Sequence, residues 1–194
     1  MSTNSLVAIL NEDNTVTSSY VHYDGYTEGV GEMLLENYNS EELARDLAEN
    51  LGYASSLRET IEASHADRAN SDVAETYEDY LDFEEYIREC SYLEYVYVWD
   101  THEDRWMVAS WETTKKKVHN GTCFDYEFES HWNGFEELVT VYIREGWETV
   151  RRMRKLAEEG STSDYVMYAD ELEETVTKWN RIGIAKVAEE AMAA

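Results

Sequence analysis

The sequence predicts an α+β fold, in which an antiparallel sheet built from two β-hairpins packs against helices and a part made of long helices follows. Strand-like segments flank short polar turns near residues 5–23 and 92–113, and in the second of these hairpins the residues alternate with a period of two. Between and after them, apolar residues recur every three to four positions. The chain has no proline and 9 glycines in 194 residues, so no linker composition divides it into domains.

The chain begins with the first hairpin. The segments SLVAIL (5–10) and TVTSSYVHY (15–23) flank the turn sequence NEDN. Strand-favouring residues on both sides of polar turn residues are typical of a β-hairpin. A helix is expected over about residues 29–38, directly after this hairpin.

Clear end signals bound the next helix, at residues 41–51. Ser40 is placed to cap its N-terminus, two glutamates occupy the first turn, and Gly52 ends it. Three leucines at i, i+4 and i+8 are expected to face the core: Leu43, Leu47 and Leu51.

The segment 72–89 is expected to form a helix that is half core and half acidic. Its predicted core side holds Val73, Tyr77, Tyr80, Leu81 and Ile87. Carboxylates three or four residues apart on a helix lie ~5–6 Å from one another. Six of them form the predicted acidic face: Glu75, Glu78, Asp79, Asp82, Glu85 and Glu89.

The clearest hairpin lies at residues 92–113. Tyr, Val and Trp alternate there with polar residues on both sides of the turn THED. The sequence FDYEFESHW at 124–132 favours a further strand. These elements complete an α+β part over residues 1–132.

Residues 133–194 are expected to form two long helices that pack on that part within one domain. The first has Glu136 and Glu137 in its first turn and basic residues near its end, which complements the helix macrodipole. The second is expected to begin after Ser163 as N-cap, and Gly183 could interrupt it.

Charge is the strongest compositional signal. The chain has 42 acidic and 16 basic residues, a formal net charge of −26, and its first 100 residues carry 23 acidic and 4 basic ones. Such a field repels nucleic acid and anionic membranes and attracts basic surfaces. Direct binding to nucleic acid or membrane is therefore not expected. Adaptation to a high-salt habitat is an alternative explanation of the acidity.

The composition also indicates a location. No window approaches the ~20 apolar residues that span a bilayer, and the N-terminus has no basic region typical of a signal peptide. Cys90 and Cys123 lack the spacing of a metal site and are too few for a disulfide framework. We expect a cytoplasmic protein.

The stretch YVHYDGYTEGVG, residues 20–31, has the most unusual local composition. Its three glycines lie between a strand and a helix, but no Lys or Arg accompanies them and the spacing matches no phosphate-binding loop. The glycines are expected to shape a tight strand-to-helix corner. The residues that define this motif are Tyr20, His22, Asp24, Gly25, Tyr26, Gly29 and Gly31.

Two His-x-Asp pairs raise a metal-site alternative. Imidazole and carboxylate are common metal ligands, so His22 and Asp24 could combine with His102 and Asp104. Short matches of this kind are frequent in so acidic a chain. No nucleophile or zinc-protease pattern is present, so no cofactor is expected and an enzyme is not the leading interpretation.

The stretch from Tyr20 to Leu57 resembles a family of uncharacterised small acidic proteins of bacteriophages and prophages. Their shared pattern is Y-x-H-[WY]-D-G-Y-x-x-G-x-G, followed by a helix and an SSL segment, here Ser55 to Leu57. The 92–113 hairpin is similar to the later part of those proteins, whereas Tyr23 stands where Trp is commoner. The resemblance implies a phage-encoded protein in the host cytoplasm, with a host-takeover or anti-defence role and no assigned catalysis.

The leading hypothesis joins this resemblance to the charge. A non-enzymatic protein would bind and inhibit a basic, nucleic-acid-binding host protein through the acidic face, in the manner of a DNA mimic. A small metal- or ligand-binding enzyme centred on His22 and Asp24 is one alternative. An oligomeric structural protein that associates through its C-terminal helices is another.

Overall fold

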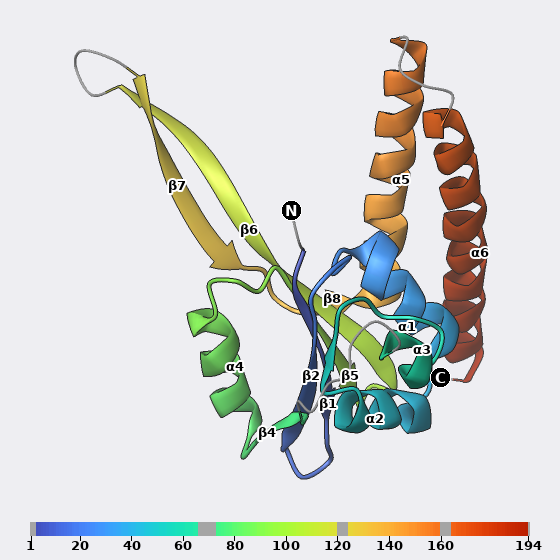
Figure 1. The fold of residues 1–194 in the computed structure, drawn as a ribbon. Coiled ribbons are helices and arrows are strands. Elements are labelled where there is room, and N and C mark those ends of the chain that lie inside the picture. Colours follow the sequence, from blue (N-terminus) through green and yellow to red (C-terminus); the bar gives the residue numbers. More distant parts are fainter. Residues whose placement is uncertain (1–2, 66–72, 120–123, 160–163, 194) are drawn as a thin grey trace.

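The computed structural model describes residues 3–65, 73–119, 124–159 and 164–193, and the side chains of these residues except at 113–119, 124–129 and 184–193. Its centre is a mixed β-sheet (Figure 1). The strand order across the sheet is β3 (Tyr53–Ala54), β2 (Val16–Val21), β1 (Ser5–Leu10), β5 (Tyr95–Asp100), β6 (Arg105–His119) and β7 (Phe124–Trp132). Two short strands complete it: β4 (Glu75–Tyr77) pairs with β2, and β8 (Glu136–Glu137) pairs with β6.

The α+β class and both predicted hairpins are confirmed, but the sheet is mixed and not purely antiparallel. Within each hairpin the pairing is antiparallel, as for Val7 opposite Ser19. Where the hairpins meet, β1 and β5 run parallel, with Val7 opposite Tyr97. The connection between β2 and β5 contains several helices, so the second hairpin can enter the sheet in the same direction as the first strand.

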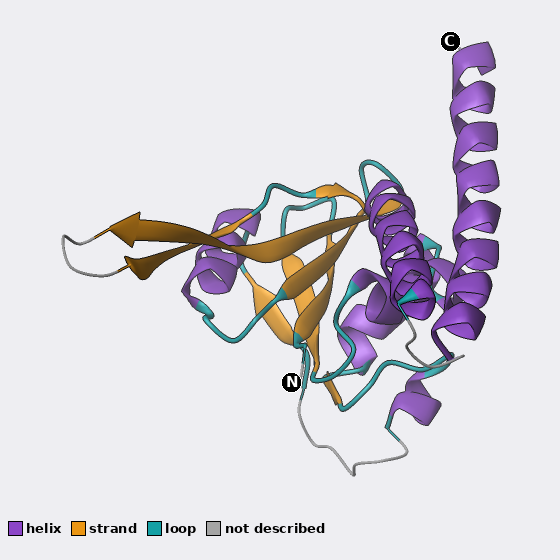
Figure 2. Ribbon diagram, turned by 90° about the horizontal axis from the view of Figure 1, so that it is seen from above, coloured by secondary structure: helices purple, strands orange, loops and turns teal. Residues whose placement is uncertain are grey.

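Helices cover both faces of the sheet (Figures 1 and 2). One face carries the π-helical turn η1 (Thr27–Gly31) with α1 (Glu32–Asn37), α2 (Glu41–Asn50), α3 (Ile61–Ser64), α5 (Leu138–Glu158) and α6 (Asp164–Ala193). The opposite face packs against α4 (Tyr80–Glu89). The paired strands β6 and β7 extend beyond both layers as a long two-stranded ribbon.

The central strands are buried on both sides. On β1, Val7 and Ile9 join the core under the larger helical layer, and Leu6 and Ala8 join the core under α4. Side chains of a strand alternate between its faces, so a strand covered on both faces is apolar throughout. This explains the uninterrupted apolar run of β1.

The predicted helices at 29–38 and 41–51 are confirmed as η1 with α1, and as α2. The Ser40 hydroxyl accepts a bond of 3.4 Å from the backbone N–H of Leu43, as expected of an N-cap. Leu43 itself is 45% exposed, so its predicted core position is wrong. Ala44 and Ala48 face the core in its place, together with Leu47.

Helix α5 begins five residues later than predicted. Glu136 and Glu137 pair with β6 as strand β8 and are not in the first helical turn. The Arg105 guanidinium lies 3.5 Å from the Glu137 carboxylate across this pairing. Helix α6 continues through Gly183 without a break, and Ser163 lies outside the described residues.

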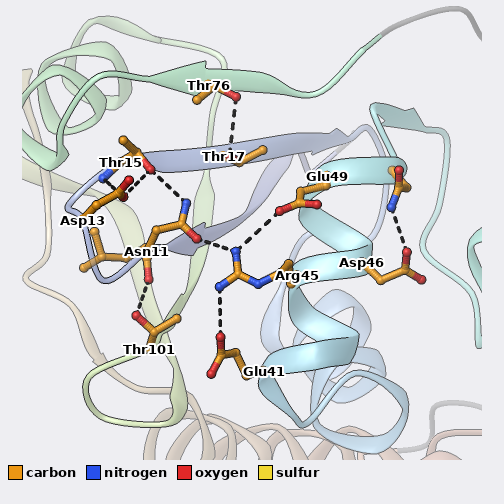
Figure 3. Close-up of polar contacts among 12 residues, drawn as sticks. Asn11, Asp13, Thr15, Thr17, Glu41, Arg45, Asp46, Glu49, Thr76 and Thr101 are labelled. Carbon is orange, nitrogen blue, oxygen red and sulfur yellow. Dashed lines mark hydrogen bonds and ion pairs between the residues drawn. The ribbon is translucent and has the colours of Figure 1, made fainter.

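A polar cluster attaches α2 to the turn between β1 and β2 (Figure 3). The Arg45 guanidinium donates to Oδ1 of Asn11 at 2.5 Å and to the carboxylate of Glu41 at 2.9 Å. Asn11 in turn donates to the Thr15 hydroxyl at 3.0 Å. Arg45 therefore connects the helix to the hairpin turn through one side chain.

Candidate functional site

Helix α4 is held against the sheet by the edge strand before it. β4 pairs antiparallel with β2, which brings the chain to the face that α4 covers. Phe83 and Ile87 are buried against the sheet, and Tyr77 packs edge-on against Phe83 with ring centroids 5.1 Å apart. These contacts orient the remaining side of α4 outward.

The predicted helix over 72–89 is wrong in its first half. Glu75 lies in strand β4 and Glu78 in the bend after it. Asp79 is the N-cap: its Oδ1 accepts backbone hydrogen bonds of 2.8 and 2.9 Å from the first turn. Edge pairing and this cap set the start of the helix at Tyr80, so the acidic residues before it are not part of one helical ladder.

Three residues of the predicted acidic face do lie together on α4: Asp82, Glu85 and Glu89. All three are exposed, and their spacing of three and four residues places them on one side of the helix. We call them the α4 carboxylates. The predicted core side is wrong at Val73 and Leu81, which are 83% and 70% exposed.

The surrounding segment is strongly acidic. Residues 73–94 carry eight acidic residues and one basic residue, Arg88. Arg88 pairs with Glu84 at 3.1 Å, so the α4 carboxylates have no ion pair among the residues that the structure describes. Helix α5, by comparison, has basic residues along its exposed side, including Arg151, Arg152 and Arg154.

The motif residues build the corner between β2 and η1. Asp24 has a φ of 60°, and its carbonyl accepts a bond of 2.8 Å from the backbone N–H of Val30. A Cβ atom on Gly29 would overlap that same carbonyl oxygen. The Tyr97 hydroxyl donates to the carbonyl of Gly25 at 2.8 Å and fixes the corner to β5. These contacts give the glycines and Asp24 a structural role.

His22 belongs to an aromatic cluster at the edge of the sheet. A hydrogen bond of 3.1 Å joins its Nδ1 to the Tyr20 hydroxyl, and the Tyr23 ring lies 4.4 Å away between centroids. Tyr20 also packs against Tyr53 at 5.4 Å. Burial raises the pKa of Tyr20 to about 12. The hydrogen bond between Tyr20 and His22 therefore holds together a cluster of packed aromatic rings.

The structure does not bring the two His-x-Asp pairs together. His22 and Asp24 follow the end of β2 that pairs with Ser5, whereas His102 and Asp104 lie in the turn after Asp100, at the opposite end of the sheet. No group of three potential metal ligands occurs among the described residues. The four-residue metal site is therefore wrong.

A carboxylate pair that the sequence interpretation missed lies beside the motif corner. The Thr27 hydroxyl contacts Oε2 of Glu145 at 2.6 Å and Oε2 of Glu28 at 3.2 Å. Thr149 donates to the other oxygen of Glu28 at 2.7 Å. Because a hydroxyl carries one proton, Thr27 donates its hydrogen bond mainly to the nearer carboxylate, that of Glu145.

The setting of Glu145 favours proton uptake at its carboxyl group. Burial, followed by the charge of Glu28, raises the pKa of Glu145, although the Thr27 hydrogen bond opposes the shift. Glu28 and Glu145 line a cavity of about 690 Å³, together with residues that include Tyr26 and Tyr95. Raised carboxyl pKa values in a cavity are found at many acid–base sites, and also at structural pairs. In the sequence, the one indication of this site is that Glu145 lies beside the apolar face of its predicted helix.

No family model, curated protein or solved structure matches this chain. None of the described helices combines the length and apolarity needed to cross a bilayer.

Proposed function

We propose that the protein binds a basic, nucleic-acid-binding host protein through the α4 carboxylates and inhibits it by occupying its nucleic-acid site. The proposal depends on the charge of the segment 73–94, which contains eight acidic residues and one arginine. Helix α4, within this segment, presents its exposed side to solvent. The action of the protein is non-enzymatic and takes place in the cytoplasm.

The spacing of charge supports mimicry of a nucleic-acid backbone. With a rise of ~1.5 Å per residue, the α4 carboxylates supply one charge per ~5 Å along the helix axis. One strand of B-DNA supplies a phosphate every ~3.4 Å. The helix is therefore sparser than DNA, and Glu75 and Glu78 extend its charge beyond the N-terminus of α4.

The packing of α4 supports its use as a rigid recognition element. Phe83 and Ile87 anchor the helix to the sheet, so its outer side chains are presented without a folding cost on binding. Opposite charges across an interface raise the association rate at low salt and lose effect when salt screens them. Strong salt dependence is thus a signature of this proposal.

The resemblance to acidic phage proteins supports the choice of partner. Proteins that handle nucleic acid in a host cell present basic grooves, and an acidic protein without affinity for DNA can compete for them. In this proposal the partner is defined by its basic groove, and the inhibition is competitive with duplex DNA.

Affinity capture from a bacterial host lysate tests the proposal, with captured proteins identified by mass spectrometry at about 50 mM and about 500 mM salt. A variant with all three α4 carboxylates replaced by lysine should lose capture at low salt by roughly tenfold or more. The matched control is Glu158→Lys with Glu171→Lys and Glu174→Lys, which changes the net charge equally on exposed positions of α5 and α6. Equal losses in both variants, or capture that duplex DNA does not displace, would refute the proposal.

A further inference from the structure

The cavity beside the motif corner has aromatic walls that a ligand can reach. Its volume of about 690 Å³ falls in the range of ~300–1,000 Å³ that is typical of small-molecule sites. Three tyrosines from different parts of the fold line it: Tyr26 from the corner, Tyr95 from β5 and Tyr168 from α6. Tyr26 is 38% and Tyr168 40% exposed, and Tyr95 is partly buried, so none of the three is sealed in the core.

Two carboxylates without a counter-ion lie among these rings. Glu28 and Glu145 are both partly buried and converge on the Thr27 hydroxyl, at 3.2 and 2.6 Å. Arg144, the residue before Glu145, pairs with Glu136 at 2.8 Å, and neither Glu28 nor Glu145 has an ion pair within the part of the chain that the structure describes. Carboxylates removed from water are usually paired with a positive charge. A cation in this cavity would therefore stabilise the pair.

The tyrosines experience the negative field of these carboxylates. Burial is the main cause of the raised pKa of Tyr26, Tyr95 and Tyr168, and the charge of Glu28 adds to the rise in all three. The faces of tyrosine rings attract cations, which adds to the attraction of the carboxylates. The rings and the charges of the cavity thus favour the same kind of ligand.

The other lining groups narrow the class of cation. Glu148 adds a third carboxylate against one basic residue, Arg152, so an anion would meet a net negative lining. No three His, Cys, Asp or Glu side chains among the described residues are grouped to hold a metal ion. Arg152 lies ~10 Å along the helix axis from Glu145 and would repel the far end of an extended polyamine. A compact organic monocation fits best.

We propose that this cavity binds a small organic cation, a protonated amine on a short apolar body. The N–H groups of the amine donate to the carboxylates of Glu28 and Glu145, and the tyrosine rings pack against the charge and the apolar body. This site is separate from the α4 carboxylates, because Tyr95 packs on the face of the sheet opposite to α4.

The probe that tests the site is phenethylammonium, and its matched neutral analogue is phenethyl alcohol, which has a hydroxyl in place of the ammonium group. Met153 also lines the cavity, so its isotope-labelled methyl group gives an NMR signal at the site. Met153→Leu identifies this signal among those of the six methionines. We expect the amine to shift the signal saturably at about 150 mM salt, which screens distant charges. The alcohol should bind at least roughly tenfold more weakly.

Three variants assign the binding to the cavity. Glu145→Gln removes one of the paired charges and should weaken the amine by roughly three- to tenfold. Tyr168→Leu keeps an apolar side chain but removes the ring, and should weaken it by roughly two- to fivefold. Glu158→Gln, at an exposed position of α5 away from the cavity, is the control and should change the affinity by less than about twofold.

Circular dichroism on each variant first establishes that it is folded. If the wild type shows no saturable shift at Met153, or if Tyr168→Leu binds as well as the wild type, the aromatic site is refuted. If the amine and the alcohol bind equally, or if Glu145→Gln and Glu158→Gln lose affinity equally, recognition of the ammonium group by the carboxylates is refuted. Calcium at the same ionic strength should not displace the amine, and displacement would identify a metal site instead.

Discussion

The hydroxyl of Thr27 donates a hydrogen bond of 2.6 Å to Oε2 of Glu145, which joins the motif corner to a helix 118 residues further along the chain. Burial is the main cause of the raised pKa of this carboxyl in the folded protein. The folded state therefore binds its proton more tightly than the unfolded state does. The resulting stability is present below the ordinary pKa of 4.5 and is lost as the pH rises through the folded pKa.

We expect Glu145→Gln to reduce this pH dependence. The amide has no proton to lose, so the melting temperature of the variant relative to the wild type should increase as the pH rises above 4.5. Thermal unfolding across a pH series checks this. Glu158→Gln, an exposed carboxylate near the end of the same helix, controls for the loss of one negative charge. Parallel curves for the two variants would contradict the assignment.

The motif corner should not tolerate a side chain at Gly29. A Cβ there overlaps the backbone carbonyl of Asp24, which cannot move without losing its bond of 2.8 Å from Val30. We expect Gly29→Ala to lower the free energy of unfolding by about 2 kcal/mol or more. Gly134→Ala, where no atom lies within 4 Å, should change it by less than about 0.5 kcal/mol. Urea unfolding of the two variants decides this, and equal midpoints would count against it.

We expect Asp79 to stabilise α4 mainly through its capping hydrogen bonds and less through its negative charge. Asp79→Ala removes two hydrogen bonds to the first turn of α4 and should cost about 1 kcal/mol of unfolding free energy. Asp79→Asn keeps an acceptor oxygen and should restore most of that loss. Denaturant unfolding of both variants separates the two roles. Similar losses in both would show that the negative charge matters more than the cap.

The sequence predicted elements well where local signals dominate. The apolar run of β1, the alternation in β5 and the cap signals around α2 depend only on neighbouring residues. The wrong predictions of secondary structure arise where pairing between distant segments determines whether residues form a strand. Glu75 and Glu136 were expected in helices, but edge pairing with β2 and β6 places both in short strands. A helical pattern in the sequence cannot reveal such pairing.

The candidate sites show the same difference between local signals and contacts of distant segments. The α4 carboxylates share a helix and could be recognised from their spacing. Glu28 and Glu145 come together at Thr27 only because α5 returns to the sheet after a long ribbon. No spacing rule connects residues so far apart.

The close contact between α5 and α6 depends on Gly146. A Cβ at this position would overlap Cγ2 of Val176, a short and stiff side chain that is fully buried. Alanine favours a helix over glycine by ~1 kcal/mol, but overpacking costs ~1–3 kcal/mol, so Gly146→Ala should be destabilising.

A second substitution tests this explanation. When Val176 is first replaced by alanine, the overlap disappears, and Gly146→Ala should then be neutral or stabilising because only the helix preference remains. Gly183→Ala, at a helical glycine with no atom within 4 Å, should be stabilising in the wild type. Unfolding free energies of the four proteins in this double-mutant cycle provide the measurement. If Gly146→Ala costs the same with and without Val176, the two helices do not depend on this contact.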